Sequence, residues 1–376
     1  MRDAVIVDAV RTPIGKRNGA LADIHPADLS ASVLTALAER NGFEPAIIDD
    51  VIWGCVSQVS EQASNIGRNA VLTAGWPESV PATSVNRACG SSQQAVSFAA
   101  AGVIAGQYDI AIAGGVESMT RVPMFSAAQG GQPLPAAVLE RYGVEGFNQG
   151  IGAEMIAERW GFSRTVLDEY SLRSHELAAA AVDAGAFASQ LVPAGGLQSD
   201  EGIRRGGSLE KLATLKTPFK EDGVISAGNA SQISDGAGAL LLTTTEVART
   251  HGLTPIARIH TAVVAGDDPV IMLTAPIRAT ELVLRKSGLS IDDIGAFEVN
   301  EAFAPVPLAW LAETGAKEDR LNPLGGAIAV GHPLGGSGAI LMTRLVHHMR
   351  DDGIRYGLQT MCEAGGLANA TVLELI

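Results

Sequence analysis

The sequence contains an internal repeat that spans most of its 376 residues. An offset of 243 positions places Cys89 on His332 and aligns residues 48–51 with residues 291–294. After a further shift of eight residues, 106–115 matches 357–366, an apolar run closed by a glycine pair in each copy. Units of this size each hold several strands and helices and can bury their own core, unlike the units of a solenoid. The repeat therefore predicts two related domains that bring a thiol and an imidazole to equivalent loops.

Charge and cysteine content narrow the class of protein. The net charge of −14 argues against non-specific nucleic-acid binding, which needs a basic surface. The three cysteines are widely spaced and form no CxxC pair, so neither a disulfide framework nor a zinc site is indicated. An apolar strand begins at residue 4, and no apolar run approaches the ~20 residues of a membrane span. We therefore expect a soluble cytoplasmic protein without metal, membrane or nucleic-acid partners.

The order of apolar segments predicts a layered α/β fold with an insertion. Short runs rich in Val and Ile at 4–10, 51–56 and 110–113 are typical of buried strands, and 27–40 and 92–104 of helices. We expect a first half at 1–117, with part of its core at 240–254, and a second half at 255–376. Residues 118–250 break the repeat and contain two helical segments, 153–160 and 164–184, followed by several basic residues. Long insertions of this kind usually carry binding or oligomer contacts.

Cys89 and His332 are the first candidates for chemistry. Cys89 precedes a predicted helix, whose positive end favours a thiolate over a thiol. The alternative is a small buried hydrophobic residue, but Arg87, Gly90 and two serines flank the cysteine instead of apolar packing residues. His332 lies in the glycine-rich stretch 325–338, next to Pro333, which restricts the histidine towards an extended backbone. A phosphate-binding loop is the rival interpretation, but the stretch has no lysine and no GxxxxGK[ST] pattern.

Two further candidates follow predicted strands. Cys362 stands at the end of the strand that pairs with 106–115 in the repeat, and Glu363 beside it favours a polar edge over core packing. Core packing remains an open alternative for Cys362. Asn300 follows the predicted strand 296–299 and could act at the site, cap the next helix, or do both.

Together these segments resemble the thiolase family, and the resemblance covers essentially the whole chain. The segments that carry it are 5–15, 86–119, 227–231, 300–304, 325–338 and the Cys362 segment. The resemblance implies two thiolase-type βαβαβαββ domains in an α-β-α-β-α arrangement, with the insertion as the loop domain that binds coenzyme A. It also implies a homodimer or homotetramer without a permanently bound cofactor. CoA and acyl-CoA are then substrates, exchanged as 3-oxoacyl-CoA plus CoA against acetyl-CoA plus a shortened acyl-CoA.

The resemblance also assigns the roles at the catalytic site. Cys89 is the nucleophile that forms an acyl-enzyme, His332 takes its proton, and Cys362 moves the proton on the acetyl α-carbon. One oxyanion is bound by His332 and a water positioned by Asn300. The other is bound by the backbone N–H groups of Cys89 and Ala364. The family usually has glycine at position 364, so alanine is strained there if the backbone needs a positive φ.

Other residues that the resemblance assigns concern coenzyme A and the acyl group. Arg204 aligns with an arginine near the nucleotide end, and Ser231 with a serine that bonds the pantetheine. Asn148 and Gln149 stand where many acetoacetyl-CoA-forming members carry His-Met beside the acyl group. This departure favours a degradative enzyme over an acetoacetyl-CoA-forming acetyltransferase, which stays the alternative. A catalytically silent acyl-CoA-binding partner is a third possibility, supported by Ala364 alone.

Related condensing enzymes provide a last comparison within the superfamily. Ketoacyl synthases use one cysteine and two histidines at their site. The pair formed by Cys89 and Cys362 therefore argues against a ketoacyl synthase.

Overall fold

The computed structural model describes residues 2–128 and 130–376, and its strands form one mixed sheet that runs through both halves of the chain. The strand order is β4-β3-β5-β6-β1-β7-β10-β9-β8, and the short β2 (Gly15–Lys16) pairs with β6. The first half contributes β1 (Val5–Arg11), β3 (Asp50–Gly54), β4 (Ala82–Val85), β5 (Ile110–Ser118) and β6 (Ser234–Thr243). The second half contributes β7 (Ala257–Gly266), β8 (Ala296–Val299), β9 (Tyr356–Glu363) and β10 (Leu367–Leu375).

The two halves repeat the same strand topology. In the first half β3 lies parallel to β4 and β5, and β6 runs antiparallel to β5 and β1. In the second half β8 lies parallel to β9, and β10 runs antiparallel to β9 and β7. An isolated parallel bridge between Phe297 and Leu321 stands in place of β4. The halves meet between β1 and β7, where two residue pairs join the ladders.

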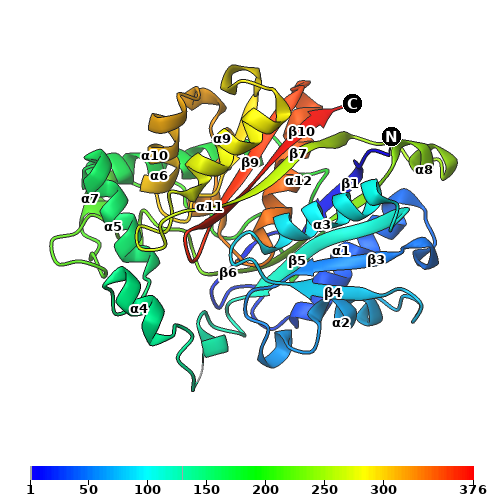
Figure 1. The fold of residues 1–376 in the computed structure, drawn as a ribbon, viewed down its shortest axis with the longest axis horizontal. Helices are drawn as coiled ribbons and strands as arrows, with labels where there is room; N and C mark the ends of the chain where they lie inside the picture. Colours follow the sequence, from blue (N-terminus) through cyan, green and yellow to red (C-terminus); the bar gives the residue numbers. More distant parts are fainter. Residues whose placement is uncertain (1, 129) are drawn as a thin grey trace.

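The helices form three layers around this sheet (Figure 1). In the middle, α3 (Ser91–Ala105) and α12 (Ser337–Asp352) share one hydrophobic cluster with strands of both halves. On the outer face of the first half, α1 (Pro26–Asn41) and α2 (Ile66–Thr73) bury a second cluster. On the outer face of the second half, α9 (Ala275–Ser287) and α10 (Pro305–Thr314) bury a third. The result is the layered α/β arrangement that the repeat predicts.

The middle helices approach each other closely near their N-termini. A Cβ at Gly338 would overlap the backbone of Gln93, so only glycine fits there without a shift. The Ser92 hydroxyl also accepts a hydrogen bond of 2.9 Å from the Ala339 N–H. This contact places the start of α3, which follows Cys89, beside the start of α12, which follows His332.

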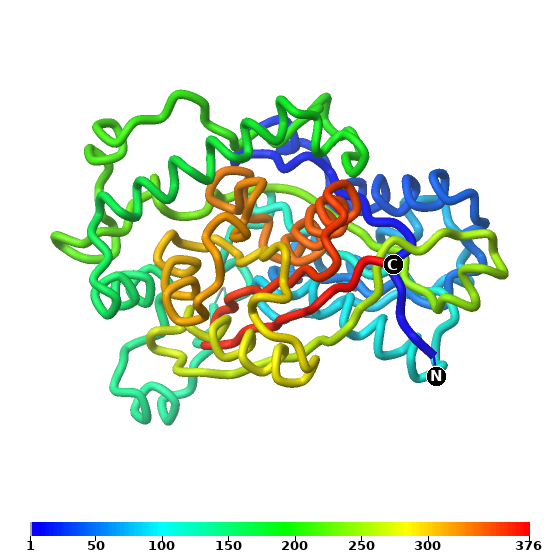
Figure 2. The backbone as a smooth tube through the Cα atoms, turned by 90° about the horizontal axis from the view of Figure 1, so that it is seen from above, coloured from blue at the N-terminus to red at the C-terminus, as the bar shows by residue number. Residues whose placement is uncertain are grey.

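The helices between β5 and β6 form a separate group. Three of them, α4 (Ala136–Tyr142), α5 (Gln149–Trp160) and α7 (Leu209–Ala213), gather at the end of the molecule away from the chain termini (Figures 1 and 2). The fourth, α6 (Arg164–Asp183), runs back towards the middle layer. The predicted helices at 153–160 and 164–184 are confirmed, and α5 begins four residues earlier than predicted. The sheet of the first half resumes at β6, within the range 118–250.

Short elements complete the chain. These are α8 (Thr245–Thr250), α11 (Ala327–Val330) and the 3₁₀ turns Pro45–Ile47, Ser60–Gln62, Ser126–Ala128, Ile291–Asp293 and Glu318–Arg320. Within residues 2–128 and 130–376, no helix is both long enough and apolar enough to cross a bilayer.

Candidate active site

Cys89 and His332 occupy equivalent turns before the two middle helices. Cys89 lies in the turn between β4 and α3, and His332 in the loop between α11 and α12. The residue before each has a positive φ, +44° at Ala88 and +109° at Gly331. For Ala88 this is an uncommon conformation that the surrounding structure must hold in place. Both side chains are almost fully buried, with 3% of each residue exposed.

Asn300 joins His332 to Cys362. Its Nδ2 lies 3.5 Å from His332 Nε2 and 3.8 Å from Cys362 Sγ, and all three side chains are buried. The N-cap of α10 is Ala304, so the proposed capping role of Asn300 is wrong. The Asn300 Oδ1 is also buried and has no hydrogen-bond partner among the described residues. The structure thus brings together three of the residues that the sequence singles out.

Ser337 fixes the tautomer of His332. The Ser337 hydroxyl donates to the Pro333 carbonyl at 2.9 Å, which uses its only proton. The 2.6 Å contact between Ser337 Oγ and His332 Nδ1 must therefore have Nδ1–H as the donor. The neutral imidazole then keeps a lone pair on Nε2, the nitrogen that faces Asn300. His332 can accept a proton only at this nitrogen.

A cavity of about 310 Å³ opens at Cys89. Ala364 and Gln149 also line this cavity, and most of its other lining residues are apolar, among them Met124, Phe125 and Leu334. Ala364 does not have a positive φ, whereas Gly365 and Gly366 do, at +86° and +73°. The strain considered for an alanine at position 364 is therefore absent.

Asn148 has a different environment from Gln149. It is the N-cap of α5, and its Oδ1 accepts from the N–H groups of Gly150 and Ile151 at 2.9 and 3.2 Å. Of the two residues predicted beside the acyl group, the structure brings only Gln149 to the cavity of Cys89.

Burial dominates the electrostatics of the site. Burial raises the pKa of the Cys89 thiol well above its usual value, and the neighbouring Cys362 and Glu363 raise it further. Burial also raises the pKa of Cys362 to about 11 and lowers the pKa of His332 to about 4. The helix end favours a thiolate at Cys89, but burial acts in the opposite direction and favours the neutral thiol. Burial therefore favours the neutral form of all three groups, the two thiols and the imidazole.

Ser231 lies beside the loop that carries Asn300. Its N–H donates to the Ala302 carbonyl at 2.9 Å, and the Asn229 carbonyl accepts from the Ala304 N–H at 2.9 Å. Asn229 is held in turn by Asp168 of α6, whose Oδ1 accepts from Asn229 Nδ2 at 2.8 Å.

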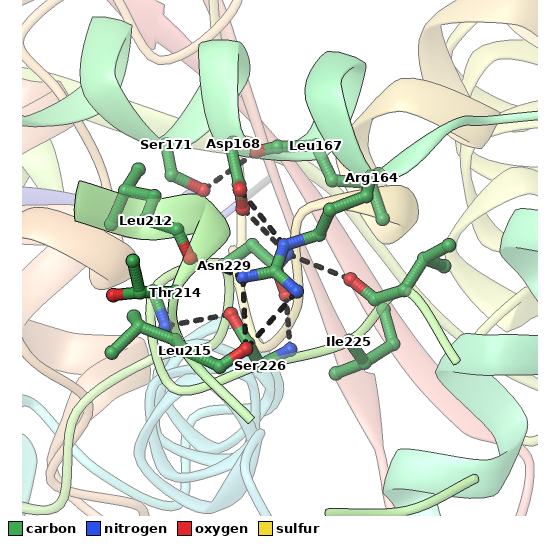
Figure 3. A network of polar contacts seen from close by, with 12 residues as sticks. Arg164, Leu167, Asp168, Ser171, Leu212, Thr214, Leu215, Ile225, Ser226 and Asn229 are labelled. Carbon is green, nitrogen blue, oxygen red and sulfur yellow. Dashed lines mark hydrogen bonds and ion pairs between the residues drawn. The ribbon is translucent and has the colours of Figure 1, made fainter. Parts of the chain in front are cut away.

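Figure 3 shows that Arg164 completes this network. Its guanidinium binds Asp168 at 2.8 Å and also the carbonyls of Leu212 and Leu215. The segment that leads to Ser231 is thereby tied to α6.

Arg204 lies in a different place from Cys89. It is exposed and lines a second hollow of about 340 Å³ together with His175 of α6. The Arg204 N–H donates to His175 Nδ1 at 3.1 Å, and burial together with the Arg204 charge lowers the pKa of His175 to about 4. Arg205 is paired with Asp183 at 2.7 Å, and both side chains are largely exposed.

Glu117 is a supporting residue that sequence reasoning missed. This fully buried carboxylate of β5 accepts from the N–H groups of Val56 and Gly335 at 2.9 and 2.8 Å, and from Gln62 Nε2 at 2.7 Å. It thus ties the loop after His332 to a wall of the Cys89 cavity. The only signal in the sequence is a carboxylate at the end of an otherwise apolar strand.

These observations define a duplicated α/β protein whose two halves share one buried cysteine–histidine site. Family models for "Thiolase, N-terminal domain" and "Thiolase, C-terminal domain" match residues 4–246 and 253–375. The chain belongs to the thiolase family, as the resemblance predicts.

Relatives and a solved structure agree with this assignment. The chain is 49% identical over 386 residues to the steroid 3-ketoacyl-CoA thiolase FadA6 of Mycobacterium tuberculosis, with 100% of this chain and 94% of the relative covered. It is 43% identical over 391 residues to a 3-ketoacyl-CoA thiolase of Escherichia fergusonii, with both chains fully covered. A crystal structure of the Bacillus anthracis acetyl-CoA acetyltransferase superposes with a TM-score of 0.92 at 35% identity, covering 100% of this chain and 99% of that one. The predicted fold class is confirmed.

Proposed function

We propose that this protein is a thiolase that works in the degradative direction, cleaving a 3-oxoacyl-CoA with CoA into acetyl-CoA and a shortened acyl-CoA. The observation that carries the proposal is the position of Asn300, within 4 Å of both His332 Nε2 and Cys362 Sγ, with Cys362 near enough to Cys89 to raise the pKa of that thiol. A nucleophile, a base and a second thiol acid in one buried site match the needs of acyl transfer coupled to proton transfer at carbon. The names of the full-length relatives support the same reaction.

In the first step, Cys89 Sγ attacks the 3-oxo carbon of the substrate. The thiol is neutral at rest, so its proton passes to His332 Nε2 as the carbon–sulfur bond forms. The backbone N–H groups of Cys89 and Ala364, which line one cavity, hold the resulting oxyanion. A single donor of this kind lowers the activation free energy by about 3 kcal/mol.

In the second step, the bond between C2 and C3 of the substrate breaks and leaves the acyl group on Cys89. The electron pair forms an acetyl-CoA enolate, whose oxygen is held by His332 and a water on Asn300. Cys362 donates its thiol proton to the carbon and releases acetyl-CoA. The incoming CoA thiol then gives its proton to the Cys362 thiolate and attacks the acyl carbon, which breaks the bond to Cys89 and releases the shortened acyl-CoA. The Cys89 sulfur takes back the proton held by His332 and is regenerated as a thiol.

The substrates are CoA thioesters, with Arg204 near the nucleotide and Ser231 near the pantetheine. Gln149 lines the cavity at the position where many acetoacetyl-CoA-forming members carry a bulky methionine, and this departure supports an acyl group longer than acetoacetyl. We place the protein in the cytoplasm as a homodimer or homotetramer, without a bound cofactor. Its three free, buried cysteines suit a reducing compartment.

The test is CoA-dependent cleavage of a series of 3-oxoacyl-CoA thioesters, combined with mass spectrometry of the acylated protein. We expect cleavage and one acyl mass on the peptide that contains Cys89. Cys55→Ser is the matched control, because Cys55 is buried beside Glu117 and lies outside the cavity. A protein that binds acyl-CoA without cleaving it, or an acyl group on Cys362, would contradict the proposal.

A further inference from the structure

Glu363 is a buried carboxyl group that the reaction described above does not use. It is the last residue of β9, directly after Cys362, and none of its surface is exposed. Neither carboxyl oxygen has a hydrogen-bond partner among the described residues. An ionised carboxylate in such a place loses its hydration without compensation, so the neutral acid is favoured.

The carboxyl group lies directly under the turn that carries Cys89. A Cβ at Gly90 would overlap the Glu363 carboxyl, and the Asn369 side chain packs at the same point. Asn369 Nδ2 donates to the Gly90 carbonyl at 3.0 Å, which fixes this turn against β10. Glu363 is therefore in contact with the residue that follows Cys89.

The charged and titratable groups around Glu363 are few. From the nucleophile turn, Arg87 and Cys89 face it, and Cys362 precedes it on β9. Arg87 acts to lower the pKa of Glu363, but burial is the larger effect and raises it to about 8. Cys89 is in turn affected by the charges of Cys362, Glu363 and, more weakly, Glu117. β10 adds only the uncharged Asn369.

We propose that the charge state of Glu363 controls the reactivity of Cys89: the carboxylate opposes ionisation of the thiol, and the neutral acid does not. The carboxyl group competes with the thiolate for the positive end of α3, because both lie at the start of that helix. Glu363 acts through Cys89 and does not touch the reacting atoms. The inference rests on the proposed role of Cys89, and its test uses a reaction that needs no thiolase turnover.

The sign of the effect follows from the two titrations. Below about pH 8 Glu363 is mainly neutral. Because the pKa of Cys89 is raised well above its usual value, its thiolate fraction rises tenfold per pH unit in this range. Above this pH Glu363 becomes charged, and a like charge at close range raises a pKa by roughly one unit or more. The thiolate fraction should then stop rising over about one pH unit before it increases again. A neutral side chain at position 363 should remove this plateau.

The experiment measures the rate of Cys89 alkylation by iodoacetamide between pH 6 and 10, followed by mass spectrometry of the Cys89 peptide. We compare the wild type with Glu363→Gln and, in case the amide disturbs folding, with Glu363→Met. The profiles should coincide below about pH 7 and separate above about pH 8, where both variants should react roughly tenfold faster than the wild type.

Glu298→Gln is the matched control. Glu298 is a buried carboxyl on the neighbouring strand β8 whose pKa burial raises to about 7, but its charged neighbours are Arg344, Glu301 and Arg11. Its substitution should leave the plateau in place. Superimposed wild-type and Glu363→Gln profiles above pH 8, or variants that react more slowly at every pH, would refute the inference. Failure of 3-oxoacyl-CoA cleavage would refute the proposed function and leave this result unaffected.

Discussion

Removal of the Ser337 hydroxyl should slow acyl transfer, although the substitution replaces no residue that contacts the substrate. The hydroxyl accepts from His332 Nδ1–H at 2.6 Å and donates to the Pro333 carbonyl at 2.9 Å. In Ser337→Ala the Nδ1–H is left buried and unpaired. The imidazole can then lower its energy by moving the proton to Nε2, and in that tautomer it cannot accept the proton of Cys89.

The size of the effect follows from the change of charge during the reaction. A hydrogen bond from neutral imidazole is worth about 1 kcal/mol, and one from the imidazolium about 1.5–3 kcal/mol. The difference, roughly 0.5–2 kcal/mol, is lost only in the transition state, because His332 is neutral at rest. At about 1.4 kcal/mol per factor of ten, kcat/KM should fall roughly 2- to 30-fold. The free energy of unfolding should also fall by about 1–3 kcal/mol.

The assay is single-turnover formation of the acyl-enzyme from an acyl-CoA, together with steady-state kcat/KM for cleavage. Ser30→Ala is a close control, because the buried Ser30 hydroxyl also donates to a proline carbonyl four residues earlier, at 2.8 Å, and accepts from a ring N–H, that of Trp53, at 3.1 Å. Ser30→Ala should lower the free energy of unfolding by a similar amount and leave kcat/KM unchanged. Equal rates for Ser337→Ala and wild type, or an equal loss in Ser30→Ala, would refute the tautomer argument.

Three further predictions concern proton transfer, CoA binding and chain length. Cys362→Ser should still acquire an acyl group on Cys89 from a simple acyl-CoA but lose deuterium exchange into acetyl-CoA, because a serine hydroxyl is too weak an acid near neutral pH; retained exchange would assign the proton to another group. Arg204→Ala should raise KM for CoA thioesters more than it lowers kcat, with a smaller difference at high salt, whereas Arg205→Ala should change little because Arg205 is paired with Asp183. Across a series of chain lengths, kcat/KM should be higher for 3-oxoacyl-CoA substrates longer than acetoacetyl-CoA; a steady decline with added carbons would count against this.

Sequence reasoning succeeds where the cause is local or repeated along the chain. The helix that becomes α3 is predicted within one residue at each end, because Gly106 ends it and a turn precedes it. The placement of Cys89 and His332 in equivalent turns, before α3 and α12, follows from the repeat alone. Both features depend on the order of residues and not on distant packing.

Sequence reasoning fails where a property depends on burial by distant segments. The pKa of Cys89 is one example, because the burial that raises it comes from segments distant in the sequence, among them Leu334, Leu341 and Met361, which share a hydrophobic cluster with Cys89. Asn300 is another, since a helix cap and a catalytic amide have the same sequence signal until the N-cap position of α10 is known. In the sequence, Glu363 indicates only a polar strand edge. Its contact with Gly90 could not be predicted, because the two positions are 273 residues apart in the sequence.

Duplication explains why such a site forms between two halves and not within one. Two like domains related by approximate symmetry place equivalent turns next to each other, here at the starts of α3 and α12, whose contact at Gly338 allows no intervening side chain. Each half then contributes one turn, and divergence can give one a thiol and the other an imidazole. The strand ends β8 and β9 of the second half add Asn300 and Cys362 to the same point. Because the contact is between backbones, a larger residue at Gly338 should disturb the relation of Cys89 to His332 before it disturbs either half alone.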